Sequence, residues 1–120
     1  MRILLIDDDR DFVEATRMVL ESVPYAVDVA HNGQAVLTQA RAVRPDLIIL
    51  DIIMPGESGL DVYEQLQAEP GLADVPVILL TSLASGLGVT PSAMTKPAEY
   101  LEKPVRPAEL LRRVRELAGG

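Results

Sequence analysis

The chain has 120 residues, of which 48% are hydrophobic and 24% are charged, as in one ordinary globular domain. It contains no cysteine, which excludes disulfides, zinc–thiolate sites and thiol catalysis. The net charge of −7, from 18 acidic and 11 basic residues, argues against direct nucleic-acid binding, which needs a basic footprint. No apolar run approaches the ~20 residues of a membrane span, and the N-terminal run is too short for a signal peptide. We therefore expect a cytoplasmic protein that does not bind membranes.

Five stretches of the chain predict β-strands. Three nearly unbroken aliphatic runs, at residues 3–6, 47–50 and 77–80, are typical of parallel strands that are covered on both faces. Two more polar stretches, at residues 25–30 and 98–102, alternate between apolar and polar residues. Alternation of this kind favours strands at the two edges of the sheet.

Helical spacing occurs between and after these strands. Apolar residues three or four positions apart predict a helix that contains Phe12 and stops at Pro24, and a second between Asn32-Gly33 and Pro45. A third helix, with apolar residues from 60 to 66, follows Ser58 as a plausible N-cap, and the last runs over residues 107–119. Residues 82–97 hold two glycines and two prolines where a further helix belongs, so we expect that segment to be short or irregular.

The alternation of strand and helix predicts the architecture. Such a pattern implies right-handed crossovers and a doubly wound α/β fold with a five-stranded parallel sheet. Placing the apolar strands in the centre gives the order 2-1-3-4-5, which is flavodoxin-like. The prediction is a single domain over residues 1–120, with an irregular fourth helix and no output domain.

Acidic residues follow two strands that this order makes neighbours. Asp7, Asp8 and Asp9 follow the first strand, and Asp51 ends the third. Ligands of open parallel sheets bind outside the carboxyl ends of the strands where the winding reverses, here between strands 1 and 3. Crowded carboxylates repel one another and persist with a cation among them. An incomplete set of oxygen ligands suits Mg²⁺, which keeps several waters.

A hydroxyl group and an ammonium group are expected at the same edge of the sheet. Thr81 ends the fourth strand and Lys103 follows the fifth. A carboxylate in a Mg²⁺ site can accept a phosphoryl group. Thr81 could then donate a hydrogen bond to one phosphoryl oxygen, and Lys103 could neutralise another.

Four motifs in register make the chain similar to a known family. They are Asp7-Asp8 after the first strand, I-I-L-D-I-I-M-P-G-E-S-G-L-D over residues 48–61, Thr81 after V-I-L-L, and Y-L-E-K-P over residues 100–104. Together they resemble the response-regulator receiver domain, the phosphoacceptor module of two-component signalling. The resemblance covers essentially the whole chain.

The resemblance implies a role for each acid in the pocket. Asp51 would be the phosphorylated aspartate. Asp8, Asp51 and the main-chain carbonyl of Ile53 would hold Mg²⁺, and Asp7 would bind the ion through water. The resemblance thus implies that the site needs Mg²⁺ as cofactor.

The resemblance also implies how the signal is made. Lys103 would pair with Asp51 and then with the phosphoryl group, while Thr81 and Tyr100 would form the switch pair. The phosphoryl donor would be a sensor histidine kinase or a phosphotransfer protein, and the output partner is unknown. The module would be a monomer or weak homodimer. It would assist its own phosphorylation and dephosphorylation without being an enzyme that turns over an external product.

Other interpretations of the same residues stay open. The acids could cap the following helix, with Asp9 as the cap. Lys96, also followed by proline, competes with Lys103, which alone follows a strand pattern. The sole histidine, His31, is expected in a solvated loop. A pseudo-receiver that binds a partner without phosphorylation is the second class of function. A phosphatase of the haloacid-dehalogenase type is disfavoured because Ile53 stands where its D-x-D motif needs an acid.

Overall fold

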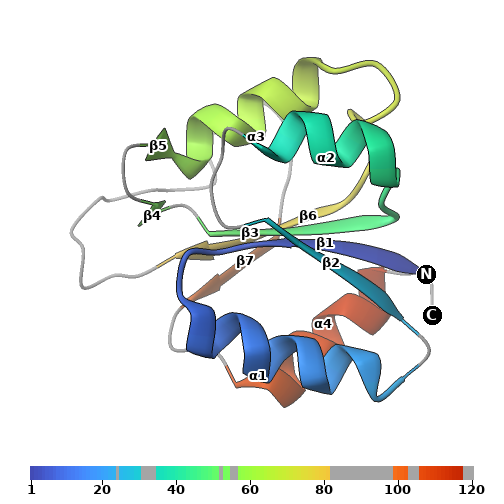
Figure 1. Ribbon diagram of the computed structural model, residues 1–120, viewed down its shortest axis with the longest axis vertical. Coiled ribbons are helices and arrows are strands. Elements are labelled where there is room, and N and C mark those ends of the chain that lie inside the picture. The colour runs from blue at the N-terminus through green and yellow to red at the C-terminus, as the bar shows by residue number, and fades with distance from the viewer. Residues whose placement is uncertain are drawn as a thin grey trace.

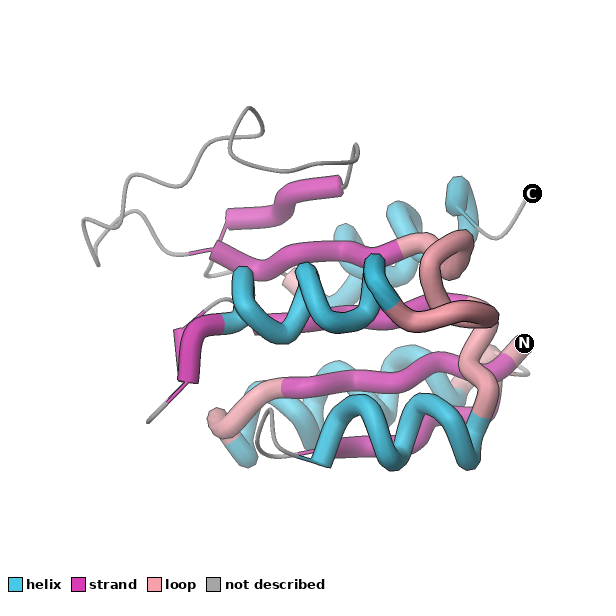
Figure 2. Tube along the Cα trace, turned by 90° about the horizontal axis from the view of Figure 1, so that it is seen from above, coloured by secondary structure: helices cyan, strands magenta, loops and turns pink. Residues whose placement is uncertain are grey.

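A five-stranded parallel sheet forms the centre of the molecule (Figure 1). The computed structural model describes residues 1–23, 25–30, 35–51, 53–54, 57–81, 99–102 and 106–117, with only the backbone at residues 53–54, 57–60, 81, 99–100 and 102. The sheet strands are β1 (Arg2–Ile6), β2 (Ala26–Ala30), β3 (Leu47–Asp51), β6 (Val77–Thr81) and β7 (Glu99–Glu102). Their order, β2-β1-β3-β6-β7, is the predicted 2-1-3-4-5 order, and the two polar strands lie at the edges as expected (Figure 2).

Helices cover both faces of this sheet. They are α1 (Arg10–Glu21), α2 (Val36–Val43), α3 (Gly59–Ala68) and α4 (Pro107–Leu117). Figure 1 shows α2 and α3 on one face and α1 and α4 on the other, which gives the three-layer α/β arrangement. The segment 82–97, predicted to be irregular, lies outside the described residues. Within the described ranges, no helix is long and apolar enough to cross a bilayer.

The central strands are apolar throughout because each contributes side chains to two cores. In β1, Leu4 and Ile6 belong to the core beneath α2 and α3, whereas Ile3 and Leu5 belong to the core above α1 and α4. All four side chains are fully buried. The same alternation runs through β3 and β6. Alternate side chains of such a strand enter the two cores, and both sets are apolar, so the sequence of the strand is an unbroken aliphatic run. That run was the basis of the strand prediction.

The first helix begins earlier than the apolar spacing predicts. Asp9 is the N-cap, and its Oδ1 accepts a hydrogen bond from the backbone N–H of Phe12 at 3.2 Å. The helix ends at Glu21, where the hydroxyl of Ser22 donates to the carbonyl of Val19 at 2.6 Å. Capping satisfies backbone groups that a helix end leaves without intrahelical partners. The interpretation of Asp9 as a cap is therefore confirmed.

A short hairpin beside the end of β3 was not predicted. Strands β4 (Ile53–Met54) and β5 (Glu57–Ser58) pair antiparallel, with Ile53 opposite Ser58 and Met54 opposite Glu57. The helix α3 follows it directly. The hairpin thus connects the carboxyl end of β3 to the start of a helix.

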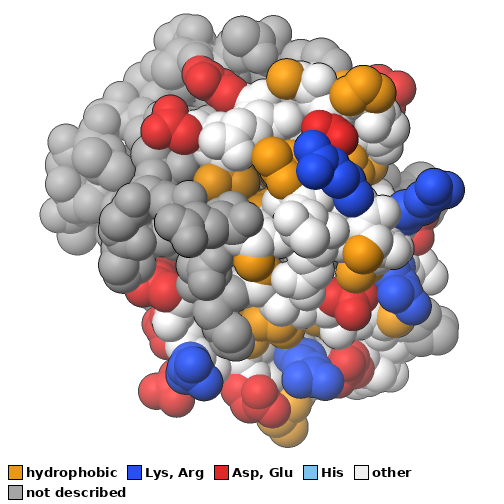
Figure 3. Space-filling model, turned by 45° about the horizontal axis from the view of Figure 1, so that its top comes forward, with side chains coloured by type: hydrophobic (Ala, Val, Ile, Leu, Met, Phe, Trp, Pro, Cys, Tyr) orange, Lys and Arg blue, Asp and Glu red, His pale blue; other side chains and the backbone are white. Residues whose placement is uncertain are grey.

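The face formed by α2 and α3 carries charges of both signs. Figure 3 shows acidic and basic side chains scattered among apolar ones on the described part of that face. A mixture of this kind has no single-sign field that would attract a large polyanion or polycation.

Candidate functional site

Strand register explains why three acids from distant segments meet. Ile6, the last residue of β1, is paired with Leu50 of β3. The next residues along the two neighbouring strands are Asp7 and Asp51, so both lie at the carboxyl edge of the sheet. Asp51 is in turn paired with Leu80 of β6. The central position of β3 places Asp51 between the ends of β1 and β6.

The carboxylates of Asp7, Asp8 and Asp51 form one acidic pocket. Each offers an oxygen, and these oxygens all lie within 4.8 Å of one another. Asp7 is fully buried, Asp51 is 5% exposed and Asp8 is exposed. Two of its acids are thus buried, and Asp8 lies at its solvent-exposed mouth. The fold confirms the predicted convergence of these three side chains.

Backbone groups and a helix end hold the acids in place. Asp7 Oδ1 accepts a hydrogen bond from the backbone N–H of Asp9 at 2.9 Å. The backbone N–H of Asp7 donates to the carbonyl of Ala30 at 3.2 Å, which ties the loop to β2. The helix α1 starts immediately afterwards, and the positive end of its dipole favours negative charge nearby. These interactions offset part of the repulsion among the acids.

The geometry suits a hard divalent cation. Two oxygens on opposite sides of one Mg²⁺ lie about 4.2 Å apart, given Mg–O distances near 2.1 Å. Oxygens already within 4.8 Å of one another need only small side-chain rotations to share an ion. Carboxylates are also the ligands that such cations prefer. The acidic triad can therefore hold a metal ion.

The structure describes some of the remaining predicted site residues by their backbone alone and does not describe the others. Thr81 ends β6 opposite Glu102 of β7, and Tyr100 is opposite Leu79, but neither side chain is described. Ile53 lies in the short β4 strand, again with its backbone alone described. Three other residues singled out from the sequence lie outside the described residues: Lys103, the competing Lys96 and His31.

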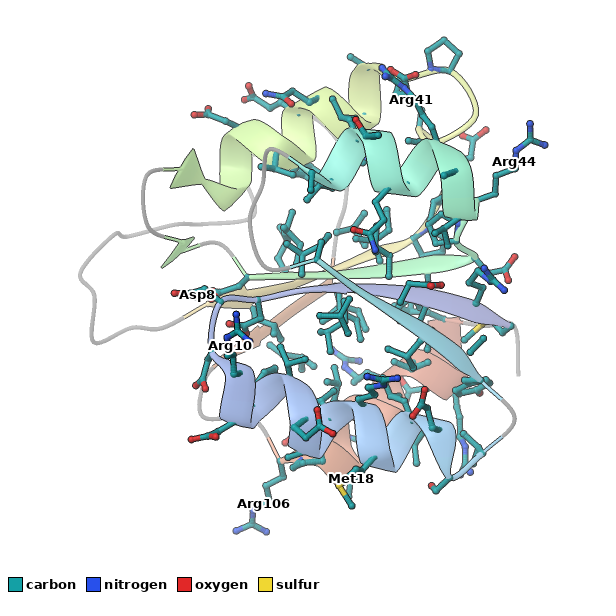
Figure 4. All side chains as sticks on the ribbon, in the orientation of Figure 1. Asp8, Arg10, Met18, Arg41, Arg44 and Arg106 are labelled. Atoms are coloured by element: carbon teal, nitrogen blue, oxygen red, sulfur yellow. The ribbon has the colours of Figure 1, made fainter. Side chains whose placement is uncertain are left out.

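A basic residue beside the pocket was not singled out from the sequence. Arg10 is the first residue of α1, two positions after Asp8, and its side chain is exposed. Figure 4 shows the labelled side chains of Asp8 and Arg10 at the same edge of the sheet. The signal in the sequence was a single arginine inside the acidic run D-D-D-R-D.

Comparison with known proteins gives this acidic pocket a family. Residues 3–115 match the sequence profile of the response regulator receiver domain. The chain belongs to this family. The predicted resemblance is thereby confirmed, and it covers nearly the whole receiver domain described above.

Relatives of this receiver domain include longer response regulators. The DNA-binding response regulator MtrA of Mycolicibacterium paratuberculosis is 37% identical over 114 residues, which are 95% of this chain and 49% of the relative. The response regulator MprA of Mycobacterium avium is 38% identical over 117 residues, 98% of this chain and 50% of the relative. The receiver chain spans about half the length of the curated relatives it matches.

A solved receiver structure has the same fold. The signal receiver domain of a signal transduction histidine kinase from Syntrophus aciditrophicus superposes with a TM-score of 0.84 at 30% sequence identity. The match covers 99% of this chain and 90% of that structure. The receiver architecture therefore extends beyond the residues that the sequence motifs identify.

Proposed function

We propose that this receiver domain is a phosphoacceptor switch and that Asp51 takes the phosphoryl group. The observation that supports the proposal is the meeting of Asp7, Asp8 and Asp51 within 4.8 Å in a chain of the receiver family. The phosphoryl donor is a phosphohistidine of a sensor histidine kinase or a phosphotransfer protein.

Exposure and neighbours favour Asp51 over the other two acids as the acceptor. Asp7 is fully buried and one of its oxygens already accepts a hydrogen bond, so a donor cannot reach it. Asp51 is slightly open, and its partner in β6 is Leu80, the residue before Thr81. The hydroxyl of Thr81 belongs to the strand next to Asp51, whereas Asp8 lies beyond β1. Asp51 is the acid best placed for help from Thr81.

The transfer is a displacement at phosphorus. An Asp51 carboxylate oxygen forms a new O–P bond, and the P–N bond to the donor imidazole breaks. The electron pair of that bond stays on the imidazole nitrogen. A Mg²⁺ ion held by Asp8, Asp51 and the main-chain carbonyl of Ile53, with Asp7 bound through water, would offset the charge on the phosphoryl oxygens. The protein's own part is to hold the acceptor oxygen in line and to exclude water around it.

The switch would follow from the new oxygens on Asp51. In this proposal the Thr81 hydroxyl donates a hydrogen bond to one phosphoryl oxygen, and Lys103 pairs with another. Tyr100 lies on β7, the strand beside β6, so a shift at Thr81 can change the packing of its ring. A difference of a few kcal/mol between two packings is enough to move most of the population from one to the other.

Labelling with acetyl phosphate tests the assignment of Asp51. In Mg²⁺ buffer the native chain should gain the mass of one phosphoryl group, and hydroxylamine should remove it because an acyl phosphate is labile to that nucleophile. Asp51→Asn should gain no mass, and EDTA should abolish labelling of the native chain. Asp74→Asn, which removes an exposed acid in the turn before β6, is the matched control and should label normally.

Two results would contradict the proposal. Retention of the label by Asp51→Asn would show that another residue is the acceptor. Absence of label on the native chain, with no spectral change on adding beryllofluoride and Mg²⁺, would favour a partner-binding pseudo-receiver.

A further inference from the structure

Arg10 is a cation at an end of a helix where a cation is unfavourable. It is the first residue of α1, and the N-terminal end of a helix carries partial positive charge. Arginine is normally favoured at the opposite end, in the last turn. Helix formation therefore gives no electrostatic reason for the charge at this position. The surrounding acids do give one.

Among the described residues, the guanidinium of Arg10 has no ion-pair partner. Other arginines of α1, α2 and α4 form salt bridges at 3.5 Å or less: Arg17, Arg41, Arg112 and Arg113. The side chain of Arg10 forms no hydrogen bond or salt bridge with any residue that the structure describes, and it is exposed. Its charge acts on its surroundings through space and not through a direct contact.

The acidic pocket lies close to Arg10 along the chain. Arg10 follows Asp8, the exposed acid at the pocket mouth, by two residues and directly follows the N-cap Asp9. Figure 4 shows Asp8 and Arg10 at the same edge of the sheet, whereas Arg106 extends away from that edge. A unit charge several ångströms from a partly solvated site still changes its potential measurably.

We propose that Arg10 sets the divalent-cation affinity of the acidic pocket. Its positive charge stabilises the metal-free carboxylates and repels an incoming Mg²⁺ ion, so it raises the Mg²⁺ concentration needed to fill half of the sites. The inference rests on the proposed function, because it takes the pocket to be the Mg²⁺ site of the switch. In that setting Arg10 adjusts how much of the receiver is loaded and ready for phosphoryl transfer.

Calorimetric titration with MgCl₂, without a phosphoryl donor, tests this role. Arg10→Gln should bind Mg²⁺ about threefold more tightly than the native chain at low ionic strength, because one repulsive charge is gone. The difference should largely disappear at about 1 M NaCl, where charges are screened within about 3 Å. Arg10→Lys keeps the charge and should keep the native affinity.

Arg106→Gln is the matched control. Arg106 is also an exposed arginine at a helix start, so the variant has the same net charge as Arg10→Gln, but its side chain points away from the pocket. It should bind Mg²⁺ as the native chain does. Equal affinity gains in both variants would assign the effect to net charge and overturn the inference.

The outcomes separate the inference from the proposed function. Native-like Mg²⁺ affinity in Arg10→Gln, together with loss of binding in Asp8→Asn, would reject the role of Arg10 and leave the pocket intact. Absence of Mg²⁺ binding by the native chain would reject the metal site itself, and the role of Arg10 with it. Tighter binding in both Arg10→Gln and Arg10→Lys would show that shape, not charge, is responsible and would also overturn the inference.

Discussion

At the scale of single residues, like charges lie close together in the acidic pocket of this receiver domain. Asp7 is fully buried and Asp51 is 5% exposed, yet their carboxylate oxygens lie within 4.8 Å of each other and of Asp8. Burial and like charge both disfavour ionised carboxylates. The fold tolerates this because the three acids sit at one edge of the sheet beside a helix N-terminus. The same repulsion favours the binding of a cation among the three carboxylates.

Replacement of Asp51 by asparagine should therefore stabilise the metal-free protein. The amide is nearly the same size and removes one of the crowded charges. We expect a gain on the order of 1 kcal/mol, or a melting temperature about 4 °C higher, in buffer with EDTA. Mg²⁺ should reverse the ranking, because the native pocket binds the ion more strongly and gains more from it.

Thermal melts followed by circular dichroism, with and without Mg²⁺, measure this effect. Asp74→Asn removes an exposed acid far along the chain from the pocket and should change the midpoint little in either buffer. An unchanged or lower midpoint for Asp51→Asn in EDTA would remove the argument from crowded carboxylates.

The acids of the pocket could be predicted from the sequence, whereas Arg10 could not. Asp7, Asp8 and Asp51 interrupt or end aliphatic runs, and parallel strands bring such ends together. Arg10 is exposed and lies at a helix start, so neither hydrophobic periodicity nor strand position marks it. Only the structure shows that Arg10 lies at the same edge as the acids and that its side chain has no partner among the described residues.

Helices and strands could be predicted from the sequence where the element is long enough for its apolar residues to repeat at a helical or strand spacing. The helix α2 (Val36–Val43) lies between the predicted limits, Gly33 and Pro45, and α4 begins at the predicted Pro107. The helix α1 begins at Arg10 instead of residue 12, because its start is set by the cap Asp9 and not by the first apolar residue. Strands β4 and β5 have two residues each, too few for an alternating pattern. The Pro-Gly pair between them was the available signal.

Within α1, a buried hydroxyl should lower the stability of the helix packing. Thr16 is 1% exposed, and its Oγ1 has no hydrogen-bond partner within the described residues. A buried hydroxyl without a partner costs its desolvation free energy. Thr16→Val replaces the hydroxyl with a methyl group of similar shape. We expect the free energy of unfolding to rise by about 1 kcal/mol.

Urea denaturation of Thr16→Val and Thr16→Ser separates the two parts of this side chain. Serine keeps the hydroxyl and loses the methyl group, so Thr16→Ser should be less stable than the native chain. A higher urea midpoint for valine and a lower one for serine are the expected results. Destabilisation by valine would mean that the hydroxyl has a stabilising role.

At the scale of the whole molecule, the strand order follows from the difference in burial between central and edge strands. β1, β3 and β6 contribute to both cores, whereas Ala26 at the edge strand β2 is exposed and Asp28 is only half-buried. That contrast separated central from edge strands in the sequence, and placing the apolar strands in the centre led to the order 2-1-3-4-5. The placement of Lys103 and of the side chains of Thr81 and Tyr100 remains a sequence prediction.

The edge of the molecule opposite the pocket is held by an ion pair between distant segments. Arg41 of α2 donates to Glu69, after α3, through Nε at 2.7 Å and through a terminal nitrogen at 2.9 Å. Figure 4 shows Arg41 far from Asp8, at the other end of the sheet. These hydrogen bonds lower the pKa of Glu69 below its ordinary value of 4.5, and they raise the pKa of Arg41.

This pair should make the stability of the whole domain depend on pH in a defined direction. Because the pKa of Glu69 is lower in the folded state, its contribution is complete above the unfolded value of 4.5 and is lost as the pH falls through the folded value. In Arg41→Gln the pKa of Glu69 should return toward its ordinary value. The native chain should therefore be the more stable at pH 7, and the two chains should converge as the pH falls below 4.5.

Urea unfolding of the native chain and of Arg41→Gln between pH 7 and pH 3 measures that convergence, and taking the difference cancels the titration of the other acids. Arg44→Gln is the control, because Arg44 is an exposed arginine near the same edge with no ion pair among the described residues. Its difference from the native chain should not follow the titration of Glu69. A difference between native and Arg41→Gln that stays constant through pH 4.5 would show that the pair stabilises through side-chain packing and not through the charge of Glu69.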